Sequence, residues 1–254
     1  MMQTTKCVAV LCAAVVLGRA SEARAQLGQA WEGRGYATVS GGAQSNSRTF
    51  DQVSAPLIYG EAAAITVPHK IGSGGIVDLS AGVRVWSNLA IGLGYSHFGN
   101  SETPTLTAQI PNPLFFNSPR SASASAGKLS HSESAVHLQF VWVEKMSDKF
   151  EVAFVVGPSF FKVGQDFVGS VTPVEGTLPF STVSIGSVQM KADSKWGTGG
   201  TGGLDVTYLV GPWWGAGFFA RYSGAKATLD LPDGGTKVIH VGGFQVGGGL
   251  RLRF

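Results

Sequence analysis

Serine, histidine and glutamate are adjacent at one point of the chain, and these are the residue types of a hydrolytic site. His131, Ser132, Glu133 and Ser134 are consecutive. A serine nucleophile, a histidine base and a carboxylate within hydrogen-bonding reach would cleave an ester or an amide. In a β-strand, however, neighbouring side chains point to opposite faces, so His131 can pair with Glu133 but not readily with Ser132. The sequence therefore predicts a polar strand end here and not an enzyme.

Other residues that could bind a metal, bind a phosphate or catalyse hydrolysis are not grouped in the sequence. The five histidines lie in separate segments, without the close spacing of a metal site. The pairs Gly199-Gly200 and Gly202-Gly203 are not followed by the Lys-Ser/Thr of a phosphate-binding loop. An aspartate–histidine protease site would need its members together, but no spacing groups the available residues Asp166, Asp230, Asp233 and His240. We expect no catalytic residue, no metal and no cofactor.

The composition narrows the class of protein. Glycine occupies 36 of 254 positions and charged residues make up only 14%, while 44% of the residues are apolar. A disordered chain would be more polar, and lysine and arginine are not clustered as a nucleic-acid surface requires. No apolar run reaches the ~20 residues of a membrane-spanning helix. A helical membrane protein is excluded, and an ordinary soluble domain with a charged surface is disfavoured.

The first 25 residues have the pattern of a secretory signal peptide. Lys6 precedes an apolar run over 7–18, and the Ala-Arg-Ala triplet at 23–25 supplies small residues before a cleavage site. Both cysteines, Cys7 and Cys12, lie in this segment. We expect residues 1–25 to be removed on export, which leaves 26–254 as a single domain with neither thiol nor disulfide.

Strand periodicity dominates the remaining sequence. Near the end, Phe244, Val246, Leu250, Leu252 and Phe254 alternate with small or polar residues. Ten residues of tilted strand span ~23 Å, close to the ~25 Å apolar band that aromatic girdles flank in membrane barrels. Similar alternation recurs over 77–85, 89–96, 135–142, 150–160, 204–208 and 214–222, with a weaker first strand over 34–44. Because the large residues occupy the apolar face throughout, we expect that face to contact lipid.

The connections predict the topology. Short turns near 87–88, 144–149 and 211–212 alternate with long segments near 45–75, 99–131, 164–195 and 224–237. Short periplasmic turns and long external loops are typical of outer-membrane barrels. We therefore predict an all-β, closed antiparallel transmembrane β-barrel of eight strands. The stretch Ile58 to Val67 also has strand character; we place it above the membrane, and counting it as spanning would give the alternative of ten strands.

Strand parity also predicts the content of the lumen. An eight-stranded barrel has an interior that side chains just fill. Arginine–carboxylate pairs satisfy both charges in such a space, whereas unpaired buried charges would be costly. The residues assigned to this charge network are Asp78, Arg84, Glu133, Glu151, Asp205, Arg221, Arg251 and Arg253.

The signal, the alternating strands, the long loops and the closing strand from Gln245 to Phe254 resemble the small outer-membrane β-barrel family of the OmpA/OmpX type. The resemblance implies a location in the bacterial outer membrane after export to the periplasm. It also implies insertion by the barrel assembly machinery, which would recognise Leu250, Leu252 and Phe254. We do not expect the peptidoglycan-binding domain of the larger relatives after the closing strand.

The second long segment contains an unusual proline-rich insert. Its prolines stiffen the backbone, and its apolar residues form an exposed knob unless something covers them. The knob either caps the barrel mouth or contacts lipopolysaccharide or another external ligand, with Arg120 and Lys128 binding phosphates. The candidate contact residues are Pro111, Pro113, Leu114, Phe115, Phe116, Pro119 and Arg120.

These observations favour a non-enzymatic integral outer-membrane protein with a narrow, charge-paired lumen, either structural or surface-interacting through its external loops. Its expected partners are outer-membrane lipid and lipopolysaccharide, with no nucleic acid. A channel for small solutes is the alternative. A lipid A-modifying barrel enzyme is the third hypothesis and has the weakest support, since His131 and Ser132 lie on opposite faces of their strand.

Overall fold

The computed structural model describes residues 34–254. The signal-peptide prediction for residues 1–25, with Cys7 and Cys12, and the segment 26–33 lie outside the described residues. Over the described range every element is a β-strand. No helix within residues 34–254 is long and apolar enough to cross a membrane.

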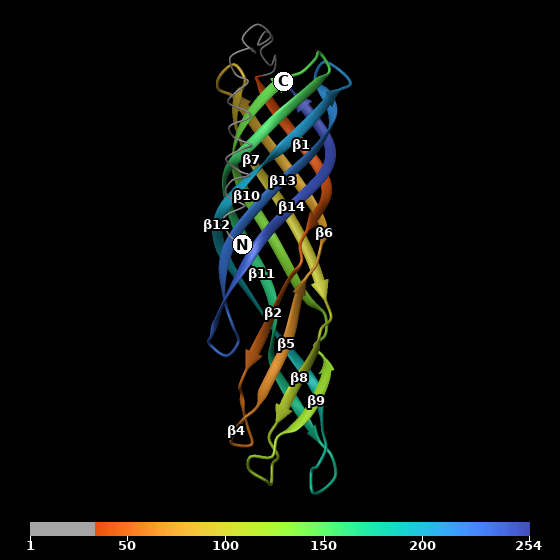
Figure 1. Cartoon of the computed structure of the whole chain (residues 1–254), viewed down its shortest axis with the longest axis vertical. Helices are drawn as coiled ribbons and strands as arrows, with labels where there is room; N and C mark the ends of the chain where they lie inside the picture. The colour runs from red at the N-terminus through yellow and green to blue at the C-terminus, as the bar shows by residue number, and fades with distance from the viewer. Residues whose placement is uncertain (1–33) are drawn as a thin grey trace, which may run out of the picture. The chain divides into compact units, whose positions relative to one another are not determined.

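Eight of the strands in the described part of the chain close into an antiparallel barrel (Figure 1). The ring closes where β1 pairs with β14, from Tyr36 opposite Arg253 to Ser45 opposite Phe244. This confirms the predicted eight-stranded barrel, and the ten-strand alternative is wrong. The ring order is β1 (Gly35–Ser45), β14 (Thr236–Arg253), β13 (Trp214–Asp230), β12 (Val183–Leu209), β11 (Phe150–Glu175), β10 (Leu129–Lys145), β7 (Leu89–Glu102) and β6 (Gly74–Arg84).

One end of the barrel carries tight turns, as the sequence predicts. Backbone hydrogen bonds close them from Val85 N to Leu89 O at 2.9 Å and from Met146 N to Phe150 O at 2.9 Å. The end of the chain lies at the same rim in Figure 1, where the Arg34 amide donates to the Phe254 carbonyl at 2.7 Å. We call this rim the turn end.

The opposite end carries the long connections that the sequence predicts, but much of their length forms strands. The β11–β12 hairpin continues as strands of 26 and 27 residues. A separate sheet in the order β2, β5, β8, β9 lies beyond the barrel strands, as Figure 1 shows. We call this sheet, together with residues 164–195 of the hairpin, the distal extension. Its sheet consists of β2 (Arg48–Ser54), β5 (Ala64–Ile71), β8 (Thr105–Ile110) and β9 (Arg120–Ser125), and a short hairpin joins β3 (Leu57–Ile58) to β4 (Glu61–Ala62).

The stretch from Ile58 to Val67 therefore lies outside the ring, as its placement above the barrel predicted. The distal strands form because their side chains alternate between buried and exposed. In β8, Leu106, Ala108 and Ile110 are buried, while the intervening residues are exposed. This alternation buries one face of the sheet against the β11–β12 hairpin.

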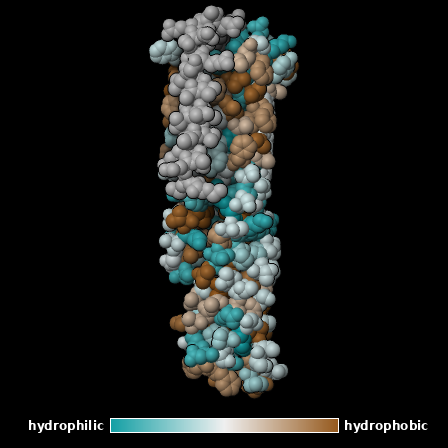
Figure 2. Space-filling view, in the orientation of Figure 1, coloured by the Kyte–Doolittle hydropathy of each residue, from teal (hydrophilic) through white to brown (hydrophobic). Residues whose placement is uncertain are grey.

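The two parts of the fold have opposite polarity. On the barrel, large apolar side chains point outward and polar ones fill the interior. In the distal extension, the inward side chains are apolar and form a core around Ile65, Leu106, Ile110, Leu129 and Val168. Figure 2 shows the corresponding change, with hydrophobic residues over the barrel strands and a mixed surface below them. The outward belt includes Val39, Leu79, Leu93, Phe140, Trp142, Phe154, Phe160, Leu204, Tyr208, Phe218, Tyr222, Phe244 and Leu250.

A second apolar core lies where the barrel meets the extension. Phe161, Phe167, Leu229, Ile239 and Val241 are buried there, each no more than 4% exposed. They come from the buried faces of β11, β13 and β14, and on β11 they alternate with the buried polar residue Gln165. We call this cluster the apolar plug; the buried polar residues His131, Glu133 and Gln165 lie at the same level of the β10–β11 ladder.

Candidate functional site

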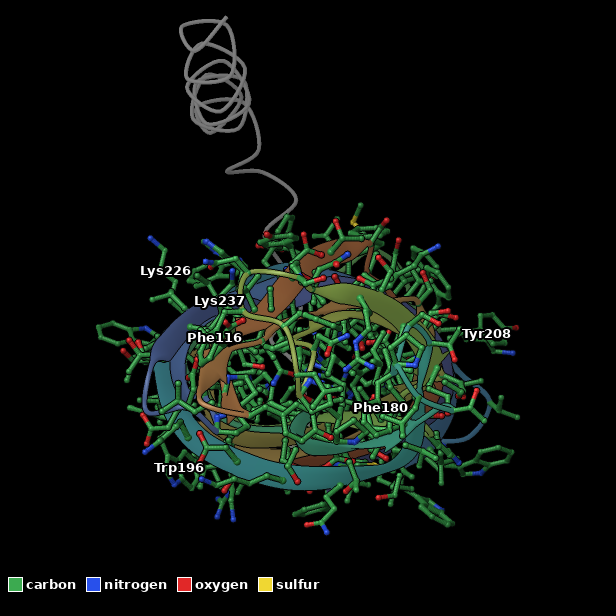
Figure 3. The ribbon with its side chains drawn as sticks, turned by 90° about the horizontal axis from the view of Figure 1, so that it is seen from below. Phe116, Phe180, Trp196, Tyr208, Lys226 and Lys237 are labelled. Carbon is green, nitrogen blue, oxygen red and sulfur yellow. The ribbon has the colours of Figure 1, made fainter. Side chains whose placement is uncertain are left out.

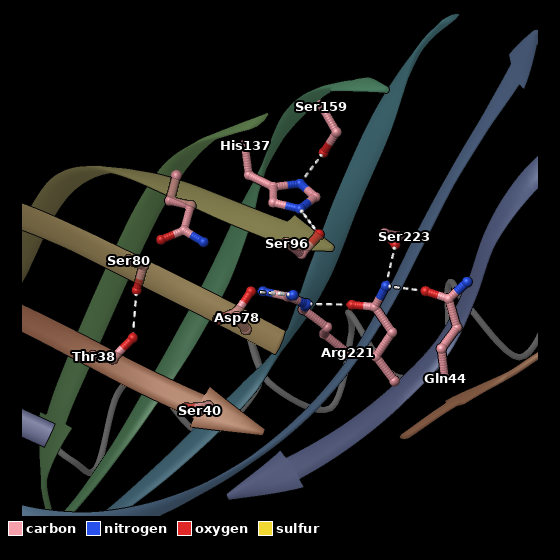
Figure 4. Close-up of polar contacts among 12 residues, drawn as sticks. Thr38, Ser40, Gln44, Asp78, Ser80, Ser96, His137, Ser159, Arg221 and Ser223 are labelled. Atoms are coloured by element: carbon pink, nitrogen blue, oxygen red, sulfur yellow. Dashed lines mark hydrogen bonds and ion pairs between the residues drawn. The ribbon is translucent and has the colours of Figure 1, made fainter. Parts of the chain in front are cut away.

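The centre of the barrel interior is an ion pair between opposite walls. Asp78 of β6 accepts a hydrogen bond from the Arg221 guanidinium of β13, and both side chains are 7% exposed. Arg221 Nε also donates to Gln245 Oε1 at 2.5 Å, and Gln245 Nε2 donates to Gln44 Oε1 at 2.7 Å. Figure 4 shows this chain of contacts. Each polar group therefore has a partner in a space that excludes most water.

Two further pairs lie nearer the turn end. Arg251 binds Asp205 through two hydrogen bonds, Nε to Oδ1 at 3.0 Å and Nη2 to Oδ2 at 2.5 Å. Arg253 pairs with Glu151. A cavity of only about 60 Å³ remains between these side chains. This is room for a few water molecules at most.

The network differs in part from the predicted set. Three of the predicted acids have an arginine partner, but Glu133 is 3.0 Å from His131 Nε2 instead. Its second oxygen accepts from Gln44 Nε2 at 3.0 Å and from the Gly242 amide at 2.8 Å. Arg84 lies half-buried at the last position of β6, away from the central pair.

A histidine with serine partners on both ring nitrogens also lies in the lumen. His137 Nε2 is 2.9 Å from Ser96 Oγ, and Nδ1 is 2.7 Å from Ser159 Oγ (Figure 4). Sequence reasoning missed this group because the three residues come from β7, β10 and β11. A serine and a histidine could be a nucleophile and a base, but here both ring nitrogens face hydroxyls, so no carboxylate orients the imidazole. His137 has no exposed surface for a substrate to reach.

The residues considered for a hydrolytic site at 131–134 do not all lie on one face of their strand, as strand geometry requires. His131 and Glu133 are both buried, at 4% and 2% exposure, whereas Ser132 lies on the other face. Among residues 34–254, no group of three or more His, Cys, Asp or Glu is placed to hold a metal ion.

The proline-rich insert lies at the far end of the distal extension, and Arg120 is its anchor. Arg120 is 8% exposed and pairs with Glu175. It also donates to the Pro111 carbonyl at 2.6 Å and the Phe180 carbonyl at 2.8 Å. The expectation that Arg120 binds phosphate is therefore wrong, because its guanidinium is already occupied inside the protein. Lys128 remains exposed.

The apolar knob does not fold into the barrel mouth. Leu114 and Phe115 are each 54% exposed and Phe116 is 79% exposed, so the capping alternative is wrong. Figure 3 shows Phe116 in a view from this end. The neighbouring loops expose Leu57 and Leu178 as well, at 79% and 72%. We call these five residues the apolar tip.

Hydrogen bonds join the three loops that carry the apolar tip. Tyr59 donates to Glu175 Oε1 at 3.0 Å, and the Asn117 amide donates to Glu61 Oε1 at 3.0 Å. Asn112 Nδ2 donates to the Phe180 carbonyl at 3.1 Å. The hydrogen bond from Arg120 holds the pKa of Glu175 below its usual range, which keeps this acceptor charged. Pro113 and Pro119 lie in the same loop.

The predicted assembly residues lie on β14, the closing strand. Leu250 and Phe254 point outward at 43% and 71% exposure, and Leu252 is half-buried. Leu250 and Phe254 therefore belong to the outward apolar face at the end of the closing strand.

A histidine is buried in the distal extension. His69 stacks on Phe50 with 4.7 Å between ring centroids and is 3.2 Å from both Gln52 and Glu102. Burial lowers the pKa of His69 to about 4, against an opposing effect of Asp51.

We expect the extension to lose stability as the pH falls from 6.5 to 4. Above pH 6.5 the His69 imidazole is neutral in both the folded and the unfolded chain. As the pH falls below 6.5, the imidazole is protonated in the unfolded chain before it is protonated in the folded chain. The full loss is about 3 kcal/mol, and Glu102, whose pKa burial raises, acts in the opposite sense. Hydrogen exchange of β5 amides at pH 7 and pH 5 measures this, and His69→Gln should flatten the difference. Equal protection of the native protein at both pH values would contradict the assignment.

Comparison with known proteins gives no family assignment, since no family model and no curated protein matches the chain. Solved structures of similar fold include the outer membrane protease OmpT from Escherichia coli, at 9% identity over 87% of this chain and 97% of that chain, with a TM-score of 0.43. OprG from Pseudomonas aeruginosa is 14% identical over 87% and 97% of the two chains, with a TM-score of 0.41. Neisserial surface protein A is 15% identical over 86% and 97%, with a TM-score of 0.39.

Proposed function

We propose that this protein is an integral outer-membrane β-barrel whose lumen is closed and whose distal extension is displayed outside the cell as a contact surface. The observation that carries the proposal is the reversal of polarity along the same strands. An apolar exterior is favourable only in lipid, and an apolar interior beneath a polar exterior is favourable in water. The boundary between the two parts then lies at the outer surface of the membrane.

The proposal treats the protein as non-enzymatic. The interior charges are satisfied by each other, and His137 and its serines are sealed from solvent. What remains exposed is the apolar tip, held by Arg120 and Glu175 in a fixed arrangement. A rigid, solvent-exposed apolar surface is typical of an interaction site. Its partners would be lipid, lipopolysaccharide or another external ligand, and insertion would use the barrel assembly machinery.

The orientation can be tested by labelling single cysteines in intact cells. Ser118→Cys lies in the distal insert and Ser147→Cys lies in a tight turn at the turn end. We expect a membrane-impermeant maleimide to label the first variant fully and the second at least tenfold less until the outer membrane is permeabilised. The opposite pattern would place the distal extension in the periplasm.

A small-solute channel is the alternative function, favoured by the cavity beside Arg221 and Arg251. In that case replacing Arg84 or Arg221 would change permeability. Under the closed-lumen proposal the same replacements change stability and leave permeability at background.

A further inference from the structure

A second surface feature lies between two strand edges at the junction of barrel and extension. The β14 ladder to β1 ends where Phe244 faces Ser45, so residues 236–243 of β14 pair with β13 alone. Strand β2 pairs with β5 alone, from Arg48 opposite Ile71 to Ser54 opposite Ile65. A cleft of about 400 Å³ separates these two edges. Strand edges of this kind offer backbone donors and acceptors to a ligand.

The lining of the cleft combines an arginine, a histidine and apolar groups. Arg48 and His240 come from its two walls, and Phe50, Ile71 and Ile239 form its apolar part. Val238, also in the lining, is 55% exposed. A cleft of this composition suits a molecule that has an anionic group attached to an apolar body.

Donors in and beside the cleft have no acceptor within the protein. Arg48 Nη1 is buried without a hydrogen-bond partner, and no ion pair joins Arg48 to an acid among residues 34–254. Asn46, in the connection just before β2, is 6% exposed, and its Nδ2 is also without a partner. Buried donors without acceptors are costly, so an external acceptor would be strongly favoured there.

Additional positive charge surrounds the cleft. Lys226 of β13 is directly opposite His240 in the ladder, and Lys237 Nζ is 5.8 Å from the centroid of the Phe50 ring. Figure 3 shows Lys226 and Lys237 on the same side of the molecule. Of the nearby acids, Asp230 is bound by Lys195 at 2.6 Å, and Asp51 is on the opposite face of β2 from Arg48.

The position of the cleft along the barrel axis can be compared with the exposed aromatic residues. Tyr222 and Phe244 form an exposed aromatic pair on β13 and β14, at 59% and 52% exposure. Lys226 and His240 are four residues farther toward the distal end, roughly 13 Å along the strands. Because aromatic girdles mark the edge of the apolar band, this position corresponds to the headgroup layer of the outer leaflet.

We propose that the cleft between β2 and β14 binds the phosphorylated headgroup of an outer-leaflet lipid, with Arg48 and His240 facing a phosphate monoester and Lys226 beside it. This inference rests on the proposed membrane orientation. Arginine is suited to phosphate because its guanidinium donates two parallel hydrogen bonds. The apolar lining would contact the remainder of the lipid.

The test uses the full-length protein refolded in detergent micelles and three probes: bisphosphorylated lipid A, dephosphorylated lipid A and inorganic phosphate. We expect the bisphosphorylated lipid to bind best and Arg48→Gln to weaken it about tenfold, the value of one lost charge-assisted hydrogen bond. Lys226→Gln, which removes an exposed side chain and leaves the packing intact, should weaken it severalfold. Lys191→Gln, an exposed cation outside the cleft, serves as the matched control and should have no effect.

Three outcomes would overturn the proposal. The two lipids could bind equally well, the Arg48→Gln and Lys226→Gln variants could both bind the bisphosphorylated lipid as tightly as the native protein does, or inorganic phosphate could bind as tightly as the lipid. The last result would indicate a site for free phosphate. Cysteine labelling at Ser118 is measured on the same variants. A normal labelling pattern without lipid binding would reject the cleft alone, whereas a reversed pattern would reject the orientation on which it rests.

Discussion

The Arg221→Ala variant should unfold at markedly lower urea concentration than the native barrel, with a loss of about 3–5 kcal/mol. The substitution leaves Asp78 buried and charged at the centre of the lumen, without its partner from the opposite wall. It also leaves Gln245 without its donor from Nε. Urea unfolding of protein refolded into lipid vesicles, followed by tryptophan fluorescence, measures the change.

The double variant Asp78→Asn with Arg221→Gln distinguishes a lost charge pair from a lost side chain. Both charges disappear together, so no unpaired charge remains, and we expect less than half of the loss seen with Arg221→Ala. Lys226→Ala, an exposed cation on the same strand, is the matched control. A double variant as unstable as the single one would mean that packing, and not charge pairing, holds the lumen together.

Arg120→Ala should release the apolar tip from the rest of the distal extension. Arg120 pairs with Glu175 and donates to the Phe180 carbonyl of the same β11–β12 hairpin and to the Pro111 carbonyl of its own loop, so its loss leaves a half-buried carboxylate without its cation. We expect local destabilisation of about 2 kcal/mol, with faster hydrogen exchange over 111–120 and 175–182. Chymotrypsin should then cut next to Phe115 or Phe116 at least tenfold faster than in the native protein.

The barrel itself should be unaffected by Arg120→Ala, so its urea midpoint serves as the internal control. Lys128→Ala, an exposed cation in the connection between β9 and β10, should change neither exchange nor cleavage. Unchanged protection in Arg120→Ala would show that the loops hold one another without the arginine.

The barrel could be predicted from sequence because both faces of each strand carry a pattern. Large apolar residues lie on the outward face, and small or charged residues lie on the inward face. The β14 strand is the clearest example, with Phe244, Leu250 and Phe254 on one face and Arg251 on the other. The lumen pairs followed from the same parity, although parity alone could not select which acid meets which arginine. Asp78 and Arg221 are 143 positions apart and meet only because the ring closes.

The distal extension was harder to predict for two physical reasons. In β9 the residues after Arg120 alternate between exposed serine and half-buried alanine, so their alternation has little contrast. In β8 the alternation of Leu106, Ala108 and Ile110 with polar residues was present but falls in a segment expected to be loop. The role of Arg120 could not be inferred, because its partner Glu175 is 55 positions away on another hairpin.

The closed lumen is the central claim, and single-channel recording in planar bilayers tests it most directly. The protein is refolded, inserted at low density and recorded beside a known porin prepared in the same way. The apolar plug at Phe161 and Leu229 and the paired charges around Arg221 predict no stable conductance steps above the leak of the bilayer. A persistent open-pore current, reproducible from one insertion to the next, would contradict the account.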